Sequence, residues 1–212
     1  MQQLNDSQAG VITVWSDISC PWATLALHTL HQEAADRGAR LTIDHRTFPL
    51  ELLNRQPGSR PKHDEEVATI TAVRTDLEWS PWEADDWTFP VTTLPALAAV
   101  QAAKQQGLEV ADALDTALRR AFFVDQRCIS LIPVIEDIAR DCAEVDADTL
   151  LEALSSGAGQ AAVFADFEIA GSDQIQGSPH IWTSDGPFAA NPGVEDVEHF
   201  TAYDSTWVDR LL

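Results

Sequence analysis

One short segment organises the chain: Trp15-Ser16-Asp17-Ile18-Ser19-Cys20-Pro21-Trp22-Ala23. It follows an apolar run, residues 11–15, that is typical of a buried strand. Apolar residues then recur at helical spacing as far as Ala34, and Gly38 predicts the end of that helix. Proline is favoured in the first turn of a helix, where its missing N–H needs no partner. We therefore expect Cys20 at the point where a strand turns into a helix.

A thiol in this position faces unpaired backbone N–H groups and the positive end of the helix dipole. Both favour the thiolate, and cysteines placed in this way reach pKa values of about 3.5–7.5 instead of about 8.5. The alternative is a small buried residue that happens to precede a proline. The sequence favours Cys20 as a nucleophile with a lowered pKa.

The pattern Asp17-x-x-Cys20-Pro21-Trp22 after a first strand resembles the thioredoxin-like DsbA superfamily and, within it, the FrnE-like branch. Members of that branch usually read Cys-Pro-Trp-Cys. The same superfamily includes kappa-class glutathione transferases and 2-hydroxychromene-2-carboxylate isomerases, which carry serine at the first position. This chain keeps the first cysteine and has Ala23 in place of the second.

Pattern alone predicts an α/β protein with a helical subdomain. The expected strands are residues 11–15, 41–48, 176–183 and 187–190, and the expected helices are 20–37, 64–77, 95–106, 110–124, 133–143, 148–155, 160–170 and one from about residue 205. The resemblance implies a thioredoxin-like fold (βαβ … ββα) with a large helical insertion. The halves of that domain would be residues 1–50 and 171–212, and the helical insertion or cap would be 51–170.

A second signature is Gly177-Ser178-Pro179, at the start of a β run. The resemblance implies that Pro179 follows a cis peptide bond and lies against the nucleophilic sulfur. It also implies that Ser178 offers its backbone N–H and C=O to an extended substrate. Pro21 and Trp22 would complete the substrate-binding wall. The alternative for Pro179 is an ordinary proline that opens a strand.

Ala23 cannot attack a mixed disulfide, so Cys20 needs another thiol to resolve one. That thiol could be a small molecule of the glutathione or mycothiol kind, a protein thiol, or Cys128. Cys142 lies on an apolar helical stripe and is expected to pack in the core. Asp17 is an auxiliary candidate that could orient the turn or shift the pKa of the thiol, with either sign.

Composition narrows the class of partner. A net charge of −21 argues against nucleic acid and anionic membranes, which reward lysine and arginine. Residues 1–9 look like a loose polar leader, and no signal peptide or membrane span is expected. The three cysteines and six histidines have no metal-ligand spacing, so we expect no metal and no tightly bound cofactor. The odd number of cysteines is typical of a protein in a reducing cytoplasm. We expect the protein to be a monomer or a homodimer.

Three functions remain open. The leading prediction is an enzyme, a DsbA/FrnE-like monothiol oxidoreductase that acts through Cys20 by thiol–disulfide exchange or as a mixed disulfide with a small thiol or a protein. The second is a thiol-dependent isomerase or transferase, and the third is a redox-inactive binding protein. The segment 51–93 is rich in proline and tryptophan, and we expect Trp79, Trp82 and Trp87 to pack in a covering layer.

Overall fold

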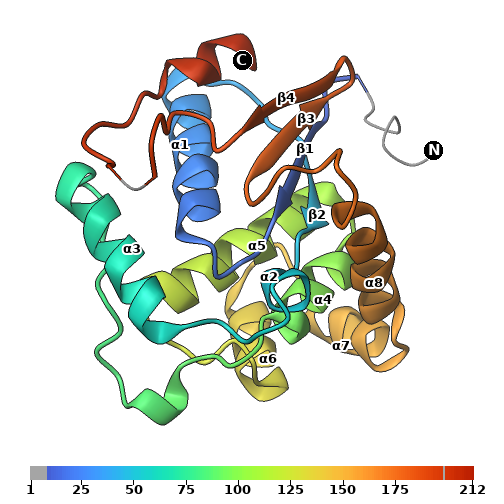
Figure 1. Ribbon diagram of the computed structural model, residues 1–212. Coiled ribbons are helices and arrows are strands. Elements are labelled where there is room, and N and C mark those ends of the chain that lie inside the picture. Colours follow the sequence, from blue (N-terminus) through green and yellow to red (C-terminus); the bar gives the residue numbers. More distant parts are fainter. Residues whose placement is uncertain (1–8, 198) are drawn as a thin grey trace.

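The computed structural model describes residues 9–197 and 199–212 (Figure 1). Within them, one sheet is built from β1 (Ile12–Ser16), β2 (Ile43–Thr47), β3 (His180–Thr183) and β4 (Gly186–Ala190). Its order is β2-β1-β3-β4. β1 runs parallel to β2 and antiparallel to β3, and β3 runs antiparallel to β4. The predicted order of strands is confirmed, and the first helix connects the two parallel strands, β1 and β2.

The helices between β2 and β3 form a block that lies below the sheet in Figure 1. In chain order the helices are α1 (Pro21–Arg37), α2 (Leu50–Leu53), α3 (Arg60–Val73), the 3₁₀ turn η1 (Asp86–Thr88), α4 (Leu94–Ala103), α5 (Leu108–Phe123), α6 (Ile132–Asp141), α7 (Ala147–Ser155), α8 (Ala158–Ala170) and η2 (Thr206–Arg210). The helices expected from pattern are present, and most end within about three residues of the prediction. The exception is α3, which begins and ends four residues before the predicted range 64–77, and the short helix α2 was not expected. The last one is a short 3₁₀ helix, η2.

The first β–turn–α unit follows the sequence closely. Every residue of β1 is buried, and α1 starts at Pro21 with Cys20 as its N-cap. The helix ends at Gly38, which has φ 61° and is left-handed, as the C-terminal glycine predicts. Buried and half-buried residues alternate along β2, so one face of this strand is more deeply buried than the other.

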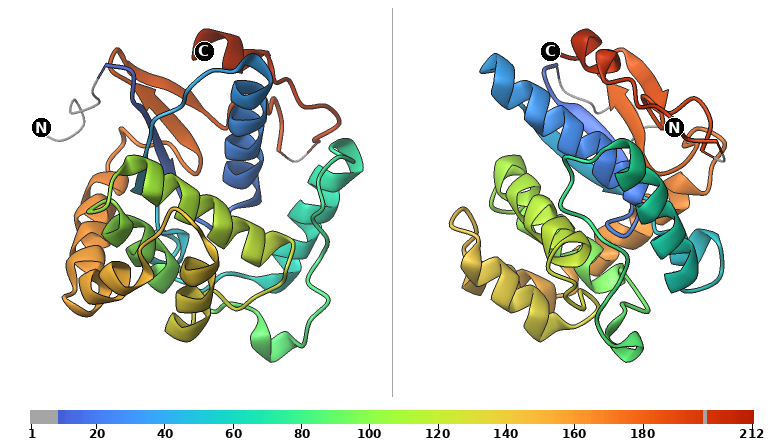
Figure 2. Two further views of the ribbon diagram at one scale, coloured as in Figure 1. Left: turned by 180° about the vertical axis from the view of Figure 1, so that it is seen from behind. Right: turned by 90° about the vertical axis from the view of Figure 1, so that its left-hand side faces the viewer.

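Two apolar layers hold the sheet and the helical block. α1 packs on the sheet with Trp207 and Val208 of η2, around Val14 and Ile181. At the end of the sheet, α4, α5 and α8 contact β2 (Figure 2). The two helices α4 and α8 approach so closely that a Cβ on Gly159 would stand 2.2 Å from the carbonyl oxygen of Ala98. Glycine is therefore required at this crossing.

Two predicted packing positions are wrong. Trp82 is 2% exposed and Trp79 packs against the helical core, but Trp87 is 82% exposed, and its indole N–H donates to nearby Asp85. Cys142 does not pack in the core. The helix α6 ends at Asp141, so Cys142 is its C-cap and no longer follows the apolar face of the helix. The side chain is therefore partly exposed.

The polar leader predicted for residues 1–9 lies almost entirely outside the described residues. Among the residues that the structure describes, no helix is both long and apolar enough to cross a membrane.

Candidate active site

The two predicted signatures meet, although 158 positions separate them in the chain. Cys20 Sγ donates a hydrogen bond to the backbone carbonyl of Ser178 at 3.0 Å. The peptide bond between Ser178 and Pro179 is cis, the geometry that the resemblance predicts. Ser178 also fixes the turn before the cysteine, because its hydroxyl oxygen accepts the N–H of Asp17 at 2.9 Å. The sulfur is therefore held against the strand that opens at residue 179.

The carboxylate of Asp17 organises the loop between β1 and α1. One of its oxygens accepts the backbone N–H and the hydroxyl of Ser19, at 2.9 and 3.0 Å. The other accepts the N–H of Leu50 and the hydroxyl of Thr93, at 2.9 and 3.1 Å. Asp17 is 1% exposed, so these four donors compensate its burial. These contacts support the first predicted role of Asp17, orientation of the turn, and its charge also raises the pKa of the Cys20 thiol.

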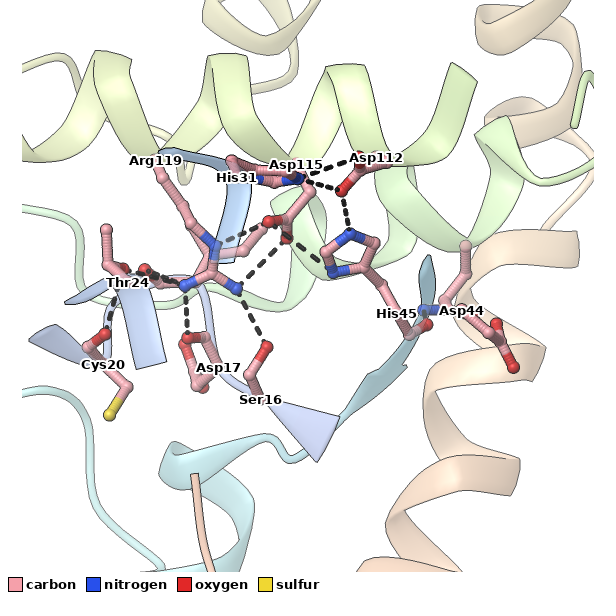
Figure 3. Close-up of polar contacts among 12 residues, drawn as sticks. Ser16, Asp17, Cys20, Thr24, His31, Asp44, His45, Asp112, Asp115 and Arg119 are labelled. Carbon is pink, nitrogen blue, oxygen red and sulfur yellow. Dashed lines mark hydrogen bonds and ion pairs between the residues drawn. The ribbon is translucent and has the colours of Figure 1, made fainter. Parts of the chain in front are cut away.

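Arg119 on α5 holds the same loop from the side of the helical block (Figure 3). This side chain is 4% exposed, and its charge is balanced by Asp115 one turn earlier, at 2.6 Å. The guanidinium donates to four oxygens around Cys20: the carbonyls of Asp17 and Ile18 and the hydroxyls of Thr24 and Ser16. The planar guanidinium is suited to holding a loop in this way, because its N–H groups donate to several oxygens in fixed directions.

The ion pair continues toward the surface through two histidines. His45 lies with Nδ1 3.7 Å from Asp115 and Nε2 2.7 Å from Asp112. Asp112 also bonds His31 on α1 at 3.0 Å. Burial lowers the pKa of His31, but the hydrogen bond and charge of Asp112 outweigh burial and raise it overall. This network joins α1, β2 and α5 behind the Cys20 loop.

Sequence reasoning missed Arg119 and its partners. A single signal was present: Asp115 and Arg119 stand four residues apart, next to the buried Leu114 and Leu118 of the same helix. A charged pair beside the apolar face of a helix predicts a buried ion pair, but not the loop that it holds.

The predicted lowering of the Cys20 pKa is wrong. The thiol is 6% exposed, and burial raises its pKa to about 11. The hydrogen bond to Ser178 and the backbone N–H of Ala23 lower the value, but they do not offset the loss of water. The carboxylates of Glu66 and Asp17 raise it further. The sulfur at the start of α1 is therefore a protonated thiol at neutral pH.

A cavity of about 250 Å³ opens beside this sulfur. Predicted site residues that line it are Asp17, Cys20, Pro21, Trp22 and Ser178. The covering segment supplies most of the rest, chiefly Leu50, Glu51, Asn54, Lys62, His63, Glu66, Phe89 and Thr92. Among the described residues that line this cavity, neither Pro179 nor Cys128 occurs. Pro179 is joined to the lining residue Ser178 by the cis peptide bond, and Cys128 lies partly exposed beyond the end of α5.

Trp22 and His63 both place a polar ring nitrogen in this wall. The indole of Trp22 hydrogen-bonds the Glu66 carboxylate and lowers the pKa of that group, and Nδ1 of His63 has no hydrogen-bond partner within the described chain. Both side chains are 6% exposed. His63 packs among Phe89, Phe122 and Phe123, and burial lowers its pKa to about 4. The cavity therefore combines a neutral imidazole, an indole and a thiol.

Comparison with known proteins agrees with this geometry. The DSBA-like thioredoxin domain family matches residues 11–203. The chain belongs to this family. Its fold is thioredoxin-like, with the helices α2–α8 inserted between β2 and β3. No curated protein matches the chain.

Several solved structures share the fold. A candidate protein disulfide isomerase from Nitrosomonas europaea is 16% identical, with 96% of each chain covered and a TM-score of 0.74. The cytosolic disulfide reductase DsbM from Pseudomonas aeruginosa is 18% identical over 81% of this chain and 83% of its own, with a TM-score of 0.61. A 2-hydroxychromene-2-carboxylate isomerase is 16% identical over 85% and 89%, with a TM-score of 0.59. These likenesses show that the three proteins and this chain share one fold.

The role of Arg119 in this DSBA-like domain can be tested by Arg119→Met. The change leaves Asp115 buried without its guanidinium and the loop oxygens without donors, so we expect a loss of about 3–5 kcal/mol in the free energy of unfolding. The matched control is Arg120→Met, since Arg120 is exposed and pairs only with exposed Glu78. That change should cost about 0–1 kcal/mol. Equal losses in urea unfolding would contradict the assignment.

The state of Cys20 predicts a pH profile. With a pKa of about 11, the thiolate fraction rises by about tenfold per pH unit from about pH 7 to about pH 10. The rate of Cys20 alkylation by iodoacetamide should follow it without a plateau, in a Cys128→Ser/Cys142→Ser variant that isolates the sulfur. A plateau below about pH 8.5 would mean that the thiol is activated in the resting protein.

Proposed function

We propose that this protein is a DsbA/FrnE-like monothiol oxidoreductase with Cys20 as its nucleophile. One observation carries the proposal: the sulfur of Cys20 lies in the wall of a cavity while it contacts the carbonyl of Ser178. A cysteine with only a packing role has no need of such an opening. Ala23, where a resolving cysteine would stand, is fully buried and offers no second thiol.

The chemistry is thiol–disulfide exchange in two separate steps. In the first, Cys20 loses its proton to the solvent and its sulfur attacks one sulfur of a bound disulfide. The S–S bond of the substrate breaks, the departing sulfur takes up a proton, and Cys20 is left in a mixed disulfide. In the second, a thiol from solution attacks that mixed disulfide and restores Cys20. No net oxidation of the protein occurs over the cycle.

The high pKa of Cys20 shapes the first step. Few molecules carry the thiolate at neutral pH, but a thiolate of high pKa is intrinsically the stronger nucleophile. The resting thiol is also protected from oxidation, which follows thiolate character and exposure. Reaction then depends on what enters the cavity, since a cation beside the sulfur would favour its ionised form.

The partner that resolves Cys20 is proposed to be a low-molecular-weight thiol of the glutathione or mycothiol kind, or a protein thiol. Such a thiol acts as co-substrate and not as a bound cofactor. We place this chemistry in a reducing compartment such as the cytoplasm, because the odd number of three cysteines suits free thiols better than a set of disulfides. The position of Cys128 outside the cavity lining weighs against its proposed part as the resolving thiol.

The burial of Cys20 supports a second candidate function, that of a redox-inactive binding protein. A thiol that is 6% exposed, with a pKa of about 11, also suits a redox-inactive protein that binds a ligand in the same cavity. The isomerase or transferase alternative requires Cys20 to activate a bound thiol, and it shares this cavity.

The functions are separated by the fate of the sulfur. We expect the Cys128→Ser/Cys142→Ser variant, incubated with bis(2-hydroxyethyl) disulfide, to gain one mercaptoethanol adduct, and a small thiol to remove it. Cys20→Ser should lose the adduct mapped to residue 20 by peptide mass spectrometry. If Cys20 stays unmodified in that variant, while the partly exposed Cys142 of the unsubstituted protein reacts, the oxidoreductase proposal fails and the binding function is favoured.

A further inference from the structure

The cavity beside Cys20 is acidic. Three of its lining side chains are carboxylates, Asp17, Glu51 and Glu66, and one is an ammonium, Lys62. Lys62 is 72% exposed and stands 3.8 Å from Glu66, so water screens much of its charge. The whole chain carries a net charge of −21, which adds to the negative potential at the opening.

The carboxylates differ in how their charge is used. Asp17 is saturated by four donors of the protein itself. Glu51 accepts the hydroxyl of Thr92 at 2.5 Å, and burial raises its pKa. Burial also raises the pKa of Glu66, and the charge of Lys62 and a hydrogen bond with Trp22 oppose this rise only in part. Glu51 and Glu66 are therefore the two carboxylates whose charge is least compensated, and a cation that entered the cavity would relieve both.

The same wall shows that the cavity is built to receive a molecule. His63 lines it, is more than nine-tenths buried, and keeps Nδ1 without a partner in the described structure. Buried polar atoms in proteins are rarely left unsatisfied. The volume of about 250 Å³ lies below the range of about 300–1,000 Å³ that is usual for ligand pockets, so the molecule is small.

We propose that the substrate of Cys20 is a small disulfide that carries amino groups and no carboxylates. The proposal rests on the function proposed above and specifies its substrate class. An ammonium group bound near Glu51 and Glu66 would lie close to the sulfur that it must activate. Small disulfides that carry carboxylates would be repelled by the same wall.

The ammonium has a part in the reaction as well as in binding. Attack by Cys20 breaks the S–S bond, transfers one half of the disulfide to Cys20 and releases the other half, which takes up a proton as the free thiol. Before attack, the ammonium lowers the cost of removing the proton from Cys20, because an opposite charge favours the thiolate. Glu66 opposes the same ionisation until the cation arrives.

The test compares three small disulfides in the Cys128→Ser/Cys142→Ser background: cystamine, bis(2-hydroxyethyl) disulfide and dithiodiglycolate. Each rate of adduct formation at Cys20 is divided by the rate of the same disulfide with free 2-mercaptoethanol. We expect cystamine to exceed dithiodiglycolate by about tenfold at low ionic strength, with the neutral disulfide between them. The ratio should shrink in about 1 M salt, where the Debye length is about 3 Å.

Matched variants assign the effect to the cavity. Glu66→Gln and Glu51→Gln should each lower the ratio of cystamine to dithiodiglycolate several-fold. Glu65→Gln, an exposed neighbour on the same helix, removes the same charge outside the cavity and should leave the ratio unchanged. Equal rates for the three disulfides would overturn the inference while leaving Cys20 an exchange nucleophile. A preference that survives both cavity variants would also overturn it, and a lack of any adduct would reject the function itself.

Discussion

The contact between the Cys20 thiol and the Ser178 carbonyl is the constraint on which the rest of the site depends. It joins the start of α1 to the strand that follows the helical block, so the sulfur is fixed only when both ends of the chain have folded together. The price is burial, which keeps the sulfur protonated in spite of its place at a helix N-terminus. The same burial that fixes the position of the Cys20 sulfur thus lowers its reactivity, because it disfavours the thiolate.

The loop that carries Cys20 is held from three directions. Ser178 bonds the backbone of Asp17, the carboxylate of Asp17 reaches Leu50 and Thr93, and Arg119 binds the loop carbonyls. Two of these anchors come from the inserted helices. The helical block therefore does more than cover the sheet: it supplies the cation behind the loop and, through the segment from Leu50 onward, most of the cavity wall.

Local rules predicted what local sequence controls. Pro21 and Gly38 mark the two ends of α1 because each acts through its own backbone, and the alternation in β2 reports burial directly. The contact between residues 20 and 178 could be predicted only from family resemblance, since no local signal links them. The contacts of Arg119 with the Cys20 loop could not be predicted, because the carbonyl and hydroxyl oxygens that it binds there lie about a hundred residues away in the chain. The predicted direction of the Cys20 pKa shift was wrong, because the sequence shows that Cys20 lies at a helix terminus but does not show how deeply that terminus is buried.

The most direct test of this account is the Raman S–H stretching band of the Cys128→Ser/Cys142→Ser variant, which retains Cys20 alone. At neutral pH we expect a single S–H band, shifted to low frequency by the hydrogen bond to the Ser178 carbonyl, and we expect it to fade only toward the pKa of about 11. Absence of the band at neutral pH would mean a thiolate. A band at the frequency of a thiol in water would mean that the contact with Ser178 is not formed, and either result would contradict the account.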